Sequence, residues 1–374
     1  MDTIKIPAES MPQDGRFGSG PSRVRPEAVA ALAKDADEYL GTSHRRPKVR
    51  AVVRRLQEGM HELFGLPSDY EILLNNGGAT LFWDSLCFGI IRQRSLHLCF
   101  GEFSSKFYRA VKEVPHLDEP VLLETPPGTH PVCEAQLGID TYALTHNGTS
   151  TGVCMELRRP EGADEDALVV VDATSAAGAM FWDPDEVDIY YFSPQKCFAG
   201  DGGLWLGAFS PVAINRIEEI HASSRWIPPT LDMKIALDNS RLNQTYNTPS
   251  LATIHLTLSQ VDWMLENGGL AWVAGRSAES ARIIYGWAEE RSFATPFVKD
   301  EAKRSPVVAT IDFDDTVIAD DIAATLRANG IVDTESYRKL GKNQLRVSLF
   351  PAIDPEEISA LCGCIDFIVE RMVG

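Results

Sequence analysis

Short apolar runs alternate with stretches of helical spacing up to about residue 250. The runs predict strands, and apolar residues spaced at i, i+3 and i+4 predict the helices between them. The predicted strands lie at 70–74, 95–100, 121–124, 143–146, 168–171, 187–192 and 204–209, and the predicted helices at 26–40, 47–64 and 81–91. Strands separated by helices indicate an α/β fold with a mostly parallel, seven-stranded sheet covered on both faces.

After about residue 250 the pattern predicts a second, compact α/β unit. Its predicted helices lie at 250–266, 275–290 and 318–329, and its predicted strands at 307–313 and 344–350. A last helix opens with Asp354 as N-cap and Pro355 at the first position, and its apolar residues form one stripe. These residues are Ile358, Leu361, Ile365, Ile368 and Met372. We expect a large domain over residues 17–255, a small C-terminal domain over 256–374, and an N-terminal arm over 1–16.

The composition of the 374 residues is that of an ordinary globular protein, with 44% hydrophobic and 24% charged residues. No apolar run approaches the roughly 20 residues that a membrane helix needs, and the first residues lack the pattern of a signal peptide. Seven cysteines without a CxxC pair indicate reduced thiols, with neither a disulfide frame nor a metal site. We expect a cytoplasmic protein that uses no membrane and no metal ion.

The chain is acidic, with 53 Asp and Glu against 35 Lys and Arg and a net charge of −18. A nucleic-acid partner is not expected, because such binding depends on a basic surface. Basic residues gather in one stretch, which contains His44, Arg45, Arg46, Lys48, Arg50, Arg54 and Arg55. For residues 50–55 a solvated helix start is the favoured interpretation, whereas Arg46 and Lys48 stay open between that and an anion site.

Two charged residues stand where apolar runs end. Asp172 closes the run 168–171, and Lys196 follows the run 190–192 after a short polar turn. Two strands that each deliver one such group are typical of a pyridoxal phosphate (PLP) site. There, a lysine holds the cofactor covalently and a carboxylate keeps its pyridine nitrogen protonated. For either residue alone, a surface lysine or an aspartate that opens a turn is the simpler interpretation. The two together favour the cofactor site.

A glycine-containing loop at residues 75–80 follows the first predicted strand and precedes a helix. Small residues let a ligand approach the backbone, and a helix N-terminus offers unpaired N–H groups to a phosphate. Many strand-to-helix turns contain glycine, so the loop becomes informative only beside the lysine. Gly77, Gly101, Asn147, Asp172 and Lys196 all follow predicted strands, and ligands of such sheets bind at the carboxyl ends of the strands.

Several motifs in order along the chain resemble those of phosphoserine aminotransferases, which are fold-type I, class V PLP enzymes. The segments that carry the resemblance are Phe17–Ser22, Gly41–Arg45, Asn76–Thr80, His146–Gly152, Val171–Ser175, Ser193–Lys196, Tyr246–Pro249, Tyr337–Leu340 and Leu345–Ser348. The resemblance covers nearly the whole chain. It implies reversible amino transfer from O-phosphoserine to 2-oxoglutarate, which yields glutamate, in L-serine biosynthesis. It also leaves open a phosphorylated hydroxythreonine as a substrate, in pyridoxine biosynthesis.

The resemblance further implies roles for the cofactor-binding residues. Lys196 holds the cofactor and moves a proton between the substrate Cα and the cofactor C4′, and Asp172 pairs with the pyridine nitrogen. Phe103 stacks on the ring, where many relatives have tryptophan, and Thr149 meets the ring hydroxyl. The cofactor phosphate is held by Ala79, Thr80 and Gln195, and by Asn247 and Thr248 of a partner subunit, which implies a homodimer with shared active sites.

For the substrate, the resemblance implies two anion sites. Arg346 is expected to bind the α-carboxylate, since a guanidinium matches a carboxylate in a bidentate way. His44, Arg45 and Arg338 are expected to meet the substrate phosphate. Two positions depart from relatives. Tyr337 stands where many have histidine, and Gly148 stands where some have glutamate, a change expected to loosen the loop.

Alternatives stay open at several positions. A surface ion pair is the alternative for Arg346, a helix cap for His44, a core position for Phe103, and plain packing for Cys197. Competing functions are another small-amino-acid aminotransferase, a cysteine desulfurase, and a non-catalytic protein on the same fold. A desulfurase needs a cysteine on a mobile loop, which Cys362 and Cys364 within a predicted helix do not provide.

Overall fold

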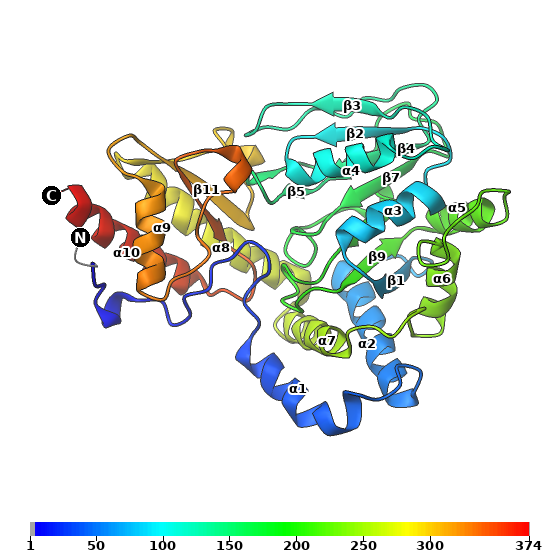
Figure 1. Ribbon diagram of the computed structural model, residues 1–374, viewed down its shortest axis with the longest axis horizontal. Coiled ribbons are helices and arrows are strands. Elements are labelled where there is room, and N and C mark those ends of the chain that lie inside the picture. The colour runs from blue at the N-terminus through cyan, green and yellow to red at the C-terminus, as the bar shows by residue number, and fades with distance from the viewer. Residues whose placement is uncertain (1–3, 374) are drawn as a thin grey trace.

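The computed structural model describes residues 4–373, and at its centre lies a seven-stranded sheet (Figure 1). The strand order is β1-β9-β8-β7-β4-β2-β3. The strands are β1 (Glu71–Asn76), β2 (Ser95–Cys99), β3 (Val121–Glu124), β4 (Thr141–Thr145), β7 (Leu168–Asp172), β8 (Ile189–Phe192) and β9 (Leu204–Phe209). Five of them, from β8 to β3 in that order, run parallel, while β9 pairs antiparallel with both β8 and β1. The predicted seven-stranded, mostly parallel sheet is confirmed.

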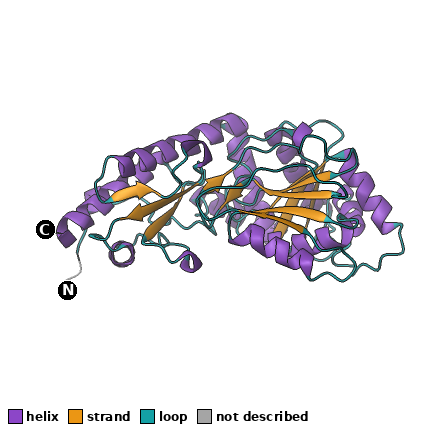
Figure 2. Ribbon diagram, turned by 90° about the horizontal axis from the view of Figure 1, so that it is seen from above, coloured by secondary structure: helices purple, strands orange, loops and turns teal. Residues whose placement is uncertain are grey.

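Both faces of this sheet are buried, because successive residues of a strand point to opposite sides and both sets are apolar. In β7, Val169 and Val171 pack in one core cluster, whereas Leu168 and Val170 pack in another. Helices α2 (Pro47–Phe64) and α7 (Leu251–Glu266) cover the first face, and α3 (Ala79–Gly89), α4 (Glu102–Lys112), α5 (Pro211–His221) and α6 (Met233–Arg241) cover the second. Figure 2 shows the strands lying between layers of helices.

A smaller antiparallel sheet of order β10-β11-β12 forms the C-terminal part of the molecule, at the left of Figure 1. Its strands are β10 (Ala294–Pro296), β11 (Val308–Phe313) and β12 (Gln344–Ser348), and its helices are α8 (Gly269–Glu289), α9 (Ala319–Ala328) and α10 (Pro355–Val373). The segment before α1 (Pro26–Tyr39) packs here too. Ile6 and Phe17 are buried in the core of this part, and the Ile6 N–H donates to Asn329 Oδ1 at 3.1 Å. Both ends of the described chain therefore lie in the same part of the molecule.

The chemical pattern explains most element bounds. Helix α2 spans the predicted residues, and Gly65 ends it with a φ of 60°, in the left-handed region that favours glycine. Helix α3 begins two residues before its predicted start, and α8 begins at Gly269, before the predicted residue 275. Helices α4, α5 and α6 and strand β10 were not predicted. The predicted stripe of α10 is buried except for Met372 in the last turn, which is 38% exposed.

The proposed division into domains stays a prediction. A boundary between residues 255 and 256 falls inside α7, and residues 1–3 of the arm and residue 374 lie outside the described residues. Within residues 4–373, no helix combines the length and apolar character that a membrane crossing requires.

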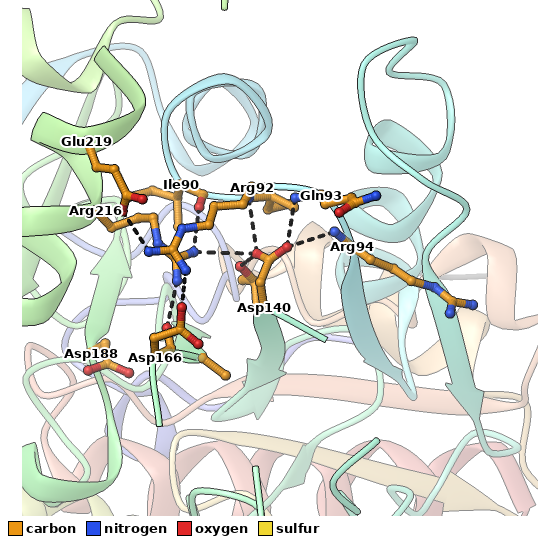
Figure 3. Close-up of polar contacts among 12 residues, drawn as sticks. Ile90, Arg92, Gln93, Arg94, Asp140, Asp166, Asp188, Arg216 and Glu219 are labelled. Atoms are coloured by element: carbon orange, nitrogen blue, oxygen red, sulfur yellow. Dashed lines mark hydrogen bonds and ion pairs between the residues drawn. The ribbon is translucent and has the colours of Figure 1, made fainter. Parts of the chain in front are cut away.

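A polar cluster closes the amino ends of the parallel strands, opposite the ends at which ligands bind (Figure 3). Asp140, just before β4, accepts the backbone N–H groups of Arg92, Gln93 and Arg94 at 2.7–3.0 Å. Arg216 of α5 is buried, and its guanidinium donates to the carbonyls of Ile90 and Asp166 at 3.1 and 2.6 Å. One buried cation thus satisfies a carbonyl from each of two connections, one directly after α3 and one directly before β7.

Replacing Arg216 with leucine should destabilise the fold, because the Ile90 and Asp166 carbonyls lose their buried donor. We expect the free energy of unfolding to fall by about 2–4 kcal/mol, measured by urea unfolding. The matched control is Arg282→Leu on α8, where an exposed guanidinium pairs with Glu279. That variant should change stability by less than about 0.5 kcal/mol. Equal effects of the two variants would contradict the role of Arg216.

Candidate active site

A cavity of about 400 Å³ opens at the carboxyl ends of the parallel strands. Most residues predicted to bind the cofactor line it: Ala79, Thr80, Phe103, Thr149, Asp172, Gln195 and Lys196. These side chains come from three strand ends and two helix starts, so only the fold brings them together. A second cavity of about 440 Å³ adjoins the first through Gly20 and Pro21, and Arg338 and Arg346 line it.

Lys196 is buried at the wall of the first cavity. Its Nζ donates to the Ser19 carbonyl, and it lies 6.0 Å from the centre of the Phe350 ring. Burial, followed by the nearby Arg346 guanidinium, lowers the pKa of Lys196 to about 7, although Asp172 acts in the opposite direction. Near neutral pH a large share of this amine is uncharged and therefore nucleophilic, as covalent capture of an aldehyde requires.

Gly20 is the residue that makes room for this amine. A Cβ at Gly20 would collide with Lys196 Nζ, and the residue has a φ of 154°. Ser22 ties the same segment to the lysine turn, since its N–H donates to the Gln195 carbonyl at 2.7 Å. The segment 19–22 therefore forms the roof over the lysine.

Asp172 ends β7 and is also buried. Burial raises its pKa, while the Thr174 N–H, which donates to Oδ1 at 2.9 Å, and Lys196 favour the charged form. A carboxylate in such a position gains strongly from a cationic partner. A protonated ring nitrogen would supply that partner within the cavity.

The first turn of α3 offers the phosphate site. Gly78 is the N-cap in extended conformation and provides no side-chain cap, so the N–H groups of Ala79 and Thr80 have no partner within the helix. Gly77 has a φ of 118°, which favours glycine, and its N–H donates to the Gly203 carbonyl at 3.0 Å. Unpaired N–H groups at the positive end of a helix dipole suit an anion.

Buried polar atoms without partners test whether this cavity suits a polar cofactor. Within residues 4–373, Ser19 Oγ, Asn147 Oδ1, Thr174 Oγ1 and Gln195 Oε1 are buried and make no hydrogen bond. The last three belong to residues that line the cavity. Buried polar groups are usually satisfied in native proteins, so three unpaired ones on the wall of one cavity are consistent with a polar ligand there. The lining thus fits PLP, and no group of residues in the described range is arranged to hold a metal ion.

Arg346 extends from β12 towards the junction of the two cavities. It lines the second cavity, and its Nη1 donates to the Thr149 carbonyl at 3.3 Å, while its buried Nε has no partner in the described chain. The surface ion pair considered for Arg346 is wrong, because no carboxylate of residues 4–373 lies within salt-bridge distance of it. Arg338 is exposed at the rim of the same cavity.

Four predicted residues lie together but line neither cavity of their own chain: His44, Arg45, Asn247 and Thr248. His44 is buried, and its Nδ1 shares a hydrogen bond of 3.2 Å with Thr248 Oγ1, while Nε2 has no partner in residues 4–373. Helix α2 has Arg46 as N-cap without a side-chain cap, so the capping role considered for His44 is wrong. Lys48 pairs with Glu38, and Arg55 with Asp262.

The structure also bears on the expectations for Phe103, Gly148 and the cysteines. Phe103 is half-buried and lines the cavity, so it is not a plain core residue. A Cβ at Gly148 would lie 3.2 Å from the Phe100 ring, so a larger residue would be crowded here, while the expected loosening of the loop stays a prediction. Cys197 is buried and packed, as are Cys362 and Cys364 on α10, so no cysteine of these three is placed to act on a substrate.

Sequence reasoning missed Trp83, Thr174 and Asp201, which also line the cavity. Thr174 follows Asp172 by two residues, and this closeness in sequence could have indicated that it lines the same cavity. Trp83 lies in the second turn of α3, and its Nε1 donates to Tyr191 OH at 2.9 Å. Nothing in the sequence shows that a residue inside an apolar helix faces a cavity.

Comparison with known proteins places the chain among aminotransferases. Residues 137–361 match the family model described as aminotransferase class-V. A protein of Mycolicibacterium paratuberculosis, named provisionally as a phosphoserine aminotransferase, is 54% identical over 99% of each chain. The phosphoserine aminotransferase of Rhodococcus jostii is 51% identical over 98% of each chain.

A solved structure shares the fold. The phosphoserine aminotransferase of Cytophaga hutchinsonii superposes with a TM-score of 0.88 and 26% sequence identity, over 95% of this chain and 99% of the other. The agreement extends through both sheets, because so large a share of the chain is covered.

The low pKa of Lys196 predicts its reactivity in the cofactor-free protein. An acylating reagent attacks only the neutral amine, so the labelling rate should rise with pH and reach half its maximum near pH 7. An ordinary lysine reaches that point near about 10.4. Labelling of the Lys196 peptide, followed by mass spectrometry from pH 5 to pH 11, measures this. A half-maximum near pH 10 would show that burial does not shift Lys196.

Proposed function

We propose that this chain, which belongs to the class V aminotransferase family, is a phosphoserine aminotransferase. It transfers the amino group of O-phospho-L-serine to 2-oxoglutarate, giving 3-phosphohydroxypyruvate and L-glutamate, and the reaction is reversible. The observation that supports this most strongly is the buried amine of Lys196, whose pKa is lowered, beside the buried carboxylate of Asp172. Their cavity adjoins a second one, lined by Arg346. The identities above 50% over nearly the whole chain support the substrate.

PLP is the cofactor of this reaction, and when bound it supplies an electron sink for charge that develops at the substrate Cα. Lys196 would bind it covalently, and Asp172 would hold its ring nitrogen protonated. The first turn of α3, through Ala79 and Thr80, and the Gln195 side chain hold its phosphate. Phe103 covers one face of the ring, and Thr149, which donates to Ser175 Oγ at 2.9 Å, retains a lone pair for the ring hydroxyl.

Lys196 also moves the proton. Because its pKa lies near 7, the free amine serves as a general base at neutral pH and, once protonated, as a general acid. It therefore takes a proton from the substrate Cα and later delivers one on the same side. The Ser19 carbonyl, which accepts a hydrogen bond from Nζ, orients the amine.

The two anions of the substrate meet different arginines. Arg346 binds the α-carboxylate, which phosphoserine, glutamate and 2-oxoglutarate all carry. The side chain is half-buried and its Nε is enclosed, so the guanidinium is partly shielded from water and gives a strong charge-assisted bond. Arg338 at the rim of the second cavity, with His44 and Arg45, receives the substrate phosphate.

A homodimer with shared sites is part of this proposal. The group His44, Arg45, Asn247 and Thr248 does not reach the cavity of its own chain, and within residues 4–373 Arg45 makes no ion pair. Beside this group, Tyr246 and Leu242 leave 38% and 51% of their surface exposed. An exposed cation surrounded by apolar side chains is typical of an interface that presents the cation to a partner. We also place the enzyme in the cytoplasm, which fits its seven free cysteines.

The half-reaction with the amino donor tests the function. O-phospho-L-serine should convert the visible absorption band of the PLP-loaded protein, whereas L-serine should scarcely change it. Arg45→Ala should reduce kcat/KM for phosphoserine by about 100-fold, as loss of a charge-assisted contact does, and leave the slow reaction with serine unchanged. Lys196→Ala is the inactive control. Equal losses on both substrates would remove Arg45 from the phosphate site, and conversion by serine alone would reject the proposed substrate.

Mixing two inactive variants tests the shared site. In a mixed dimer of Lys196→Ala and Arg45→Ala chains, one site combines an intact lysine with an intact Arg45 from the partner. Random reassociation should therefore restore about a quarter of the wild-type sites, since half of the dimers are mixed and each has one good site. Activity that stays at the level of the separate variants would show that Arg45 serves its own chain.

A further inference from the structure

Arg346 is a half-buried cation held in an unusual way. Within the described residues it has no carboxylate partner, and the only hydrogen bond of its guanidinium is the one from Nη1 to the Thr149 carbonyl. Burial lowers its pKa, and Tyr337 acts in the opposite direction. A second support is aromatic, because Arg346 Cζ lies 5.3 Å from the centre of the Tyr337 ring.

This form of support has a consequence for ligand binding. An ion pair would use the N–H groups of the guanidinium, whereas a ring face attracts the cation through its quadrupole and leaves the N–H groups free. A guanidinium held over a ring is therefore oriented, while its N–H groups stay available to a ligand. A substrate carboxylate needs both properties, since bidentate binding depends on the plane of the guanidinium.

The Tyr337 ring is itself held in place from the other side of the cavity. It contacts the Phe103 ring, with centroids 6.5 Å apart and planes at 57°. Two residues further on, Lys339 pairs with Glu102, the residue before Phe103, and the ion pair lowers the pKa of Glu102. The segment is bounded by Asp333 and Gly341, both in the left-handed region with φ of 66° and 63°. Tyr337 thus joins the small sheet to the start of α4 across the mouth of the cavity.

We infer that Tyr337 is a positioning residue, whose ring orients the Arg346 guanidinium for the α-carboxylate of every substrate of this enzyme. The inference rests on the proposed role of Arg346. It assigns the function to the ring and none to the phenol hydroxyl, and it separates Tyr337 from the phosphate of phosphoserine. The Lys339–Glu102 ion pair keeps the ring at this place.

The consequence is a pattern across substrates. Phosphoserine and 2-oxoglutarate share the α-carboxylate but not the phosphate, so loss of the ring should affect both. Tyr337→Leu keeps an apolar side chain and removes the ring face, and it should raise KM for phosphoserine and for 2-oxoglutarate by roughly 3- to 30-fold each, with a smaller change in kcat. Tyr337→Phe keeps the ring and should stay within about 2-fold of wild type on both.

The experiment compares the PLP-loaded wild type, Tyr337→Leu and Tyr337→Phe in steady-state kinetics, with equal melting temperatures as evidence of intact folding. Calorimetry of 2-oxoglutarate binding to the PLP form gives a second readout without turnover, because the keto acid has no amino group to donate. The dissociation constant should rise with leucine and not with phenylalanine. If wild type fails to use phosphoserine, the proposed function fails, and the calorimetric comparison still tests Tyr337.

Three outcomes would overturn the inference. Losses confined to phosphoserine and shared by Tyr337→Phe would assign the hydroxyl to the phosphate instead. Unchanged KM and binding in Tyr337→Leu would show that Arg346 needs no aromatic support. A fall in kcat alone, with both KM values unchanged, would mean that Tyr337 acts on the chemistry and not on carboxylate binding.

Discussion

The burial of Lys196 beside Asp172 governs how the rest of the site is built. Removing an amine and a carboxylate from water disfavours both charges, so the pKa of the lysine falls and that of the aspartate rises. The opposite charge of each residue partly offsets the effect of burial on the pKa of the other. The Ser19 carbonyl and the Thr174 N–H supply the remaining polar contacts. Parallel β7 and β8 place the two groups side by side because both strands end at the same edge. The glycine at position 20, the uncapped start of α3 and the unpaired amides around the cavity all serve this pair.

The two ends of the parallel strands differ in how their polar groups are used. At the amino ends of its strands, Arg216 and Asp140 have their polar groups fully engaged with backbone from neighbouring connections. At the carboxyl ends, polar groups are left unpaired, and Arg346 faces a cavity with free donors. A chain of net charge −18 thus keeps one set of arginines for the fold and another for anions. The same residue type serves both purposes because a guanidinium offers five donors, and the difference lies in how many the protein itself uses.

The sequence was sufficient for the sheet and for the residues that stand at strand ends. Lys196, Asp172 and the 75–80 loop were predictable because a strand end fixes where the next side chain goes. Contacts between distant segments were not predictable by such reasoning. Nothing local shows that the Tyr337 ring meets Arg346, that Trp83 faces the cavity from inside an apolar helix, or that Phe100 fills the space beside Gly148. Helix α4 was missed because serines and lysines interrupt its few buried residues, which are Ser104, Phe107 and Val111.

The position of the chain's two ends has a consequence for synthesis. Phe17 is buried in the C-terminal core, where its N–H donates to the Val332 carbonyl and its carbonyl accepts from Ser348. A ribosome makes Phe17 early and residues 332–348 late, so the large sheet can form while this early segment still lacks its partner. Ser19, whose carbonyl meets the lysine amine, follows Phe17 by two residues. The segment over Lys196 therefore gains its anchor at Phe17 only after the last strand emerges, whereas the hydrogen bond from Ser22 to Gln195 joins residues made before the small sheet and can form earlier.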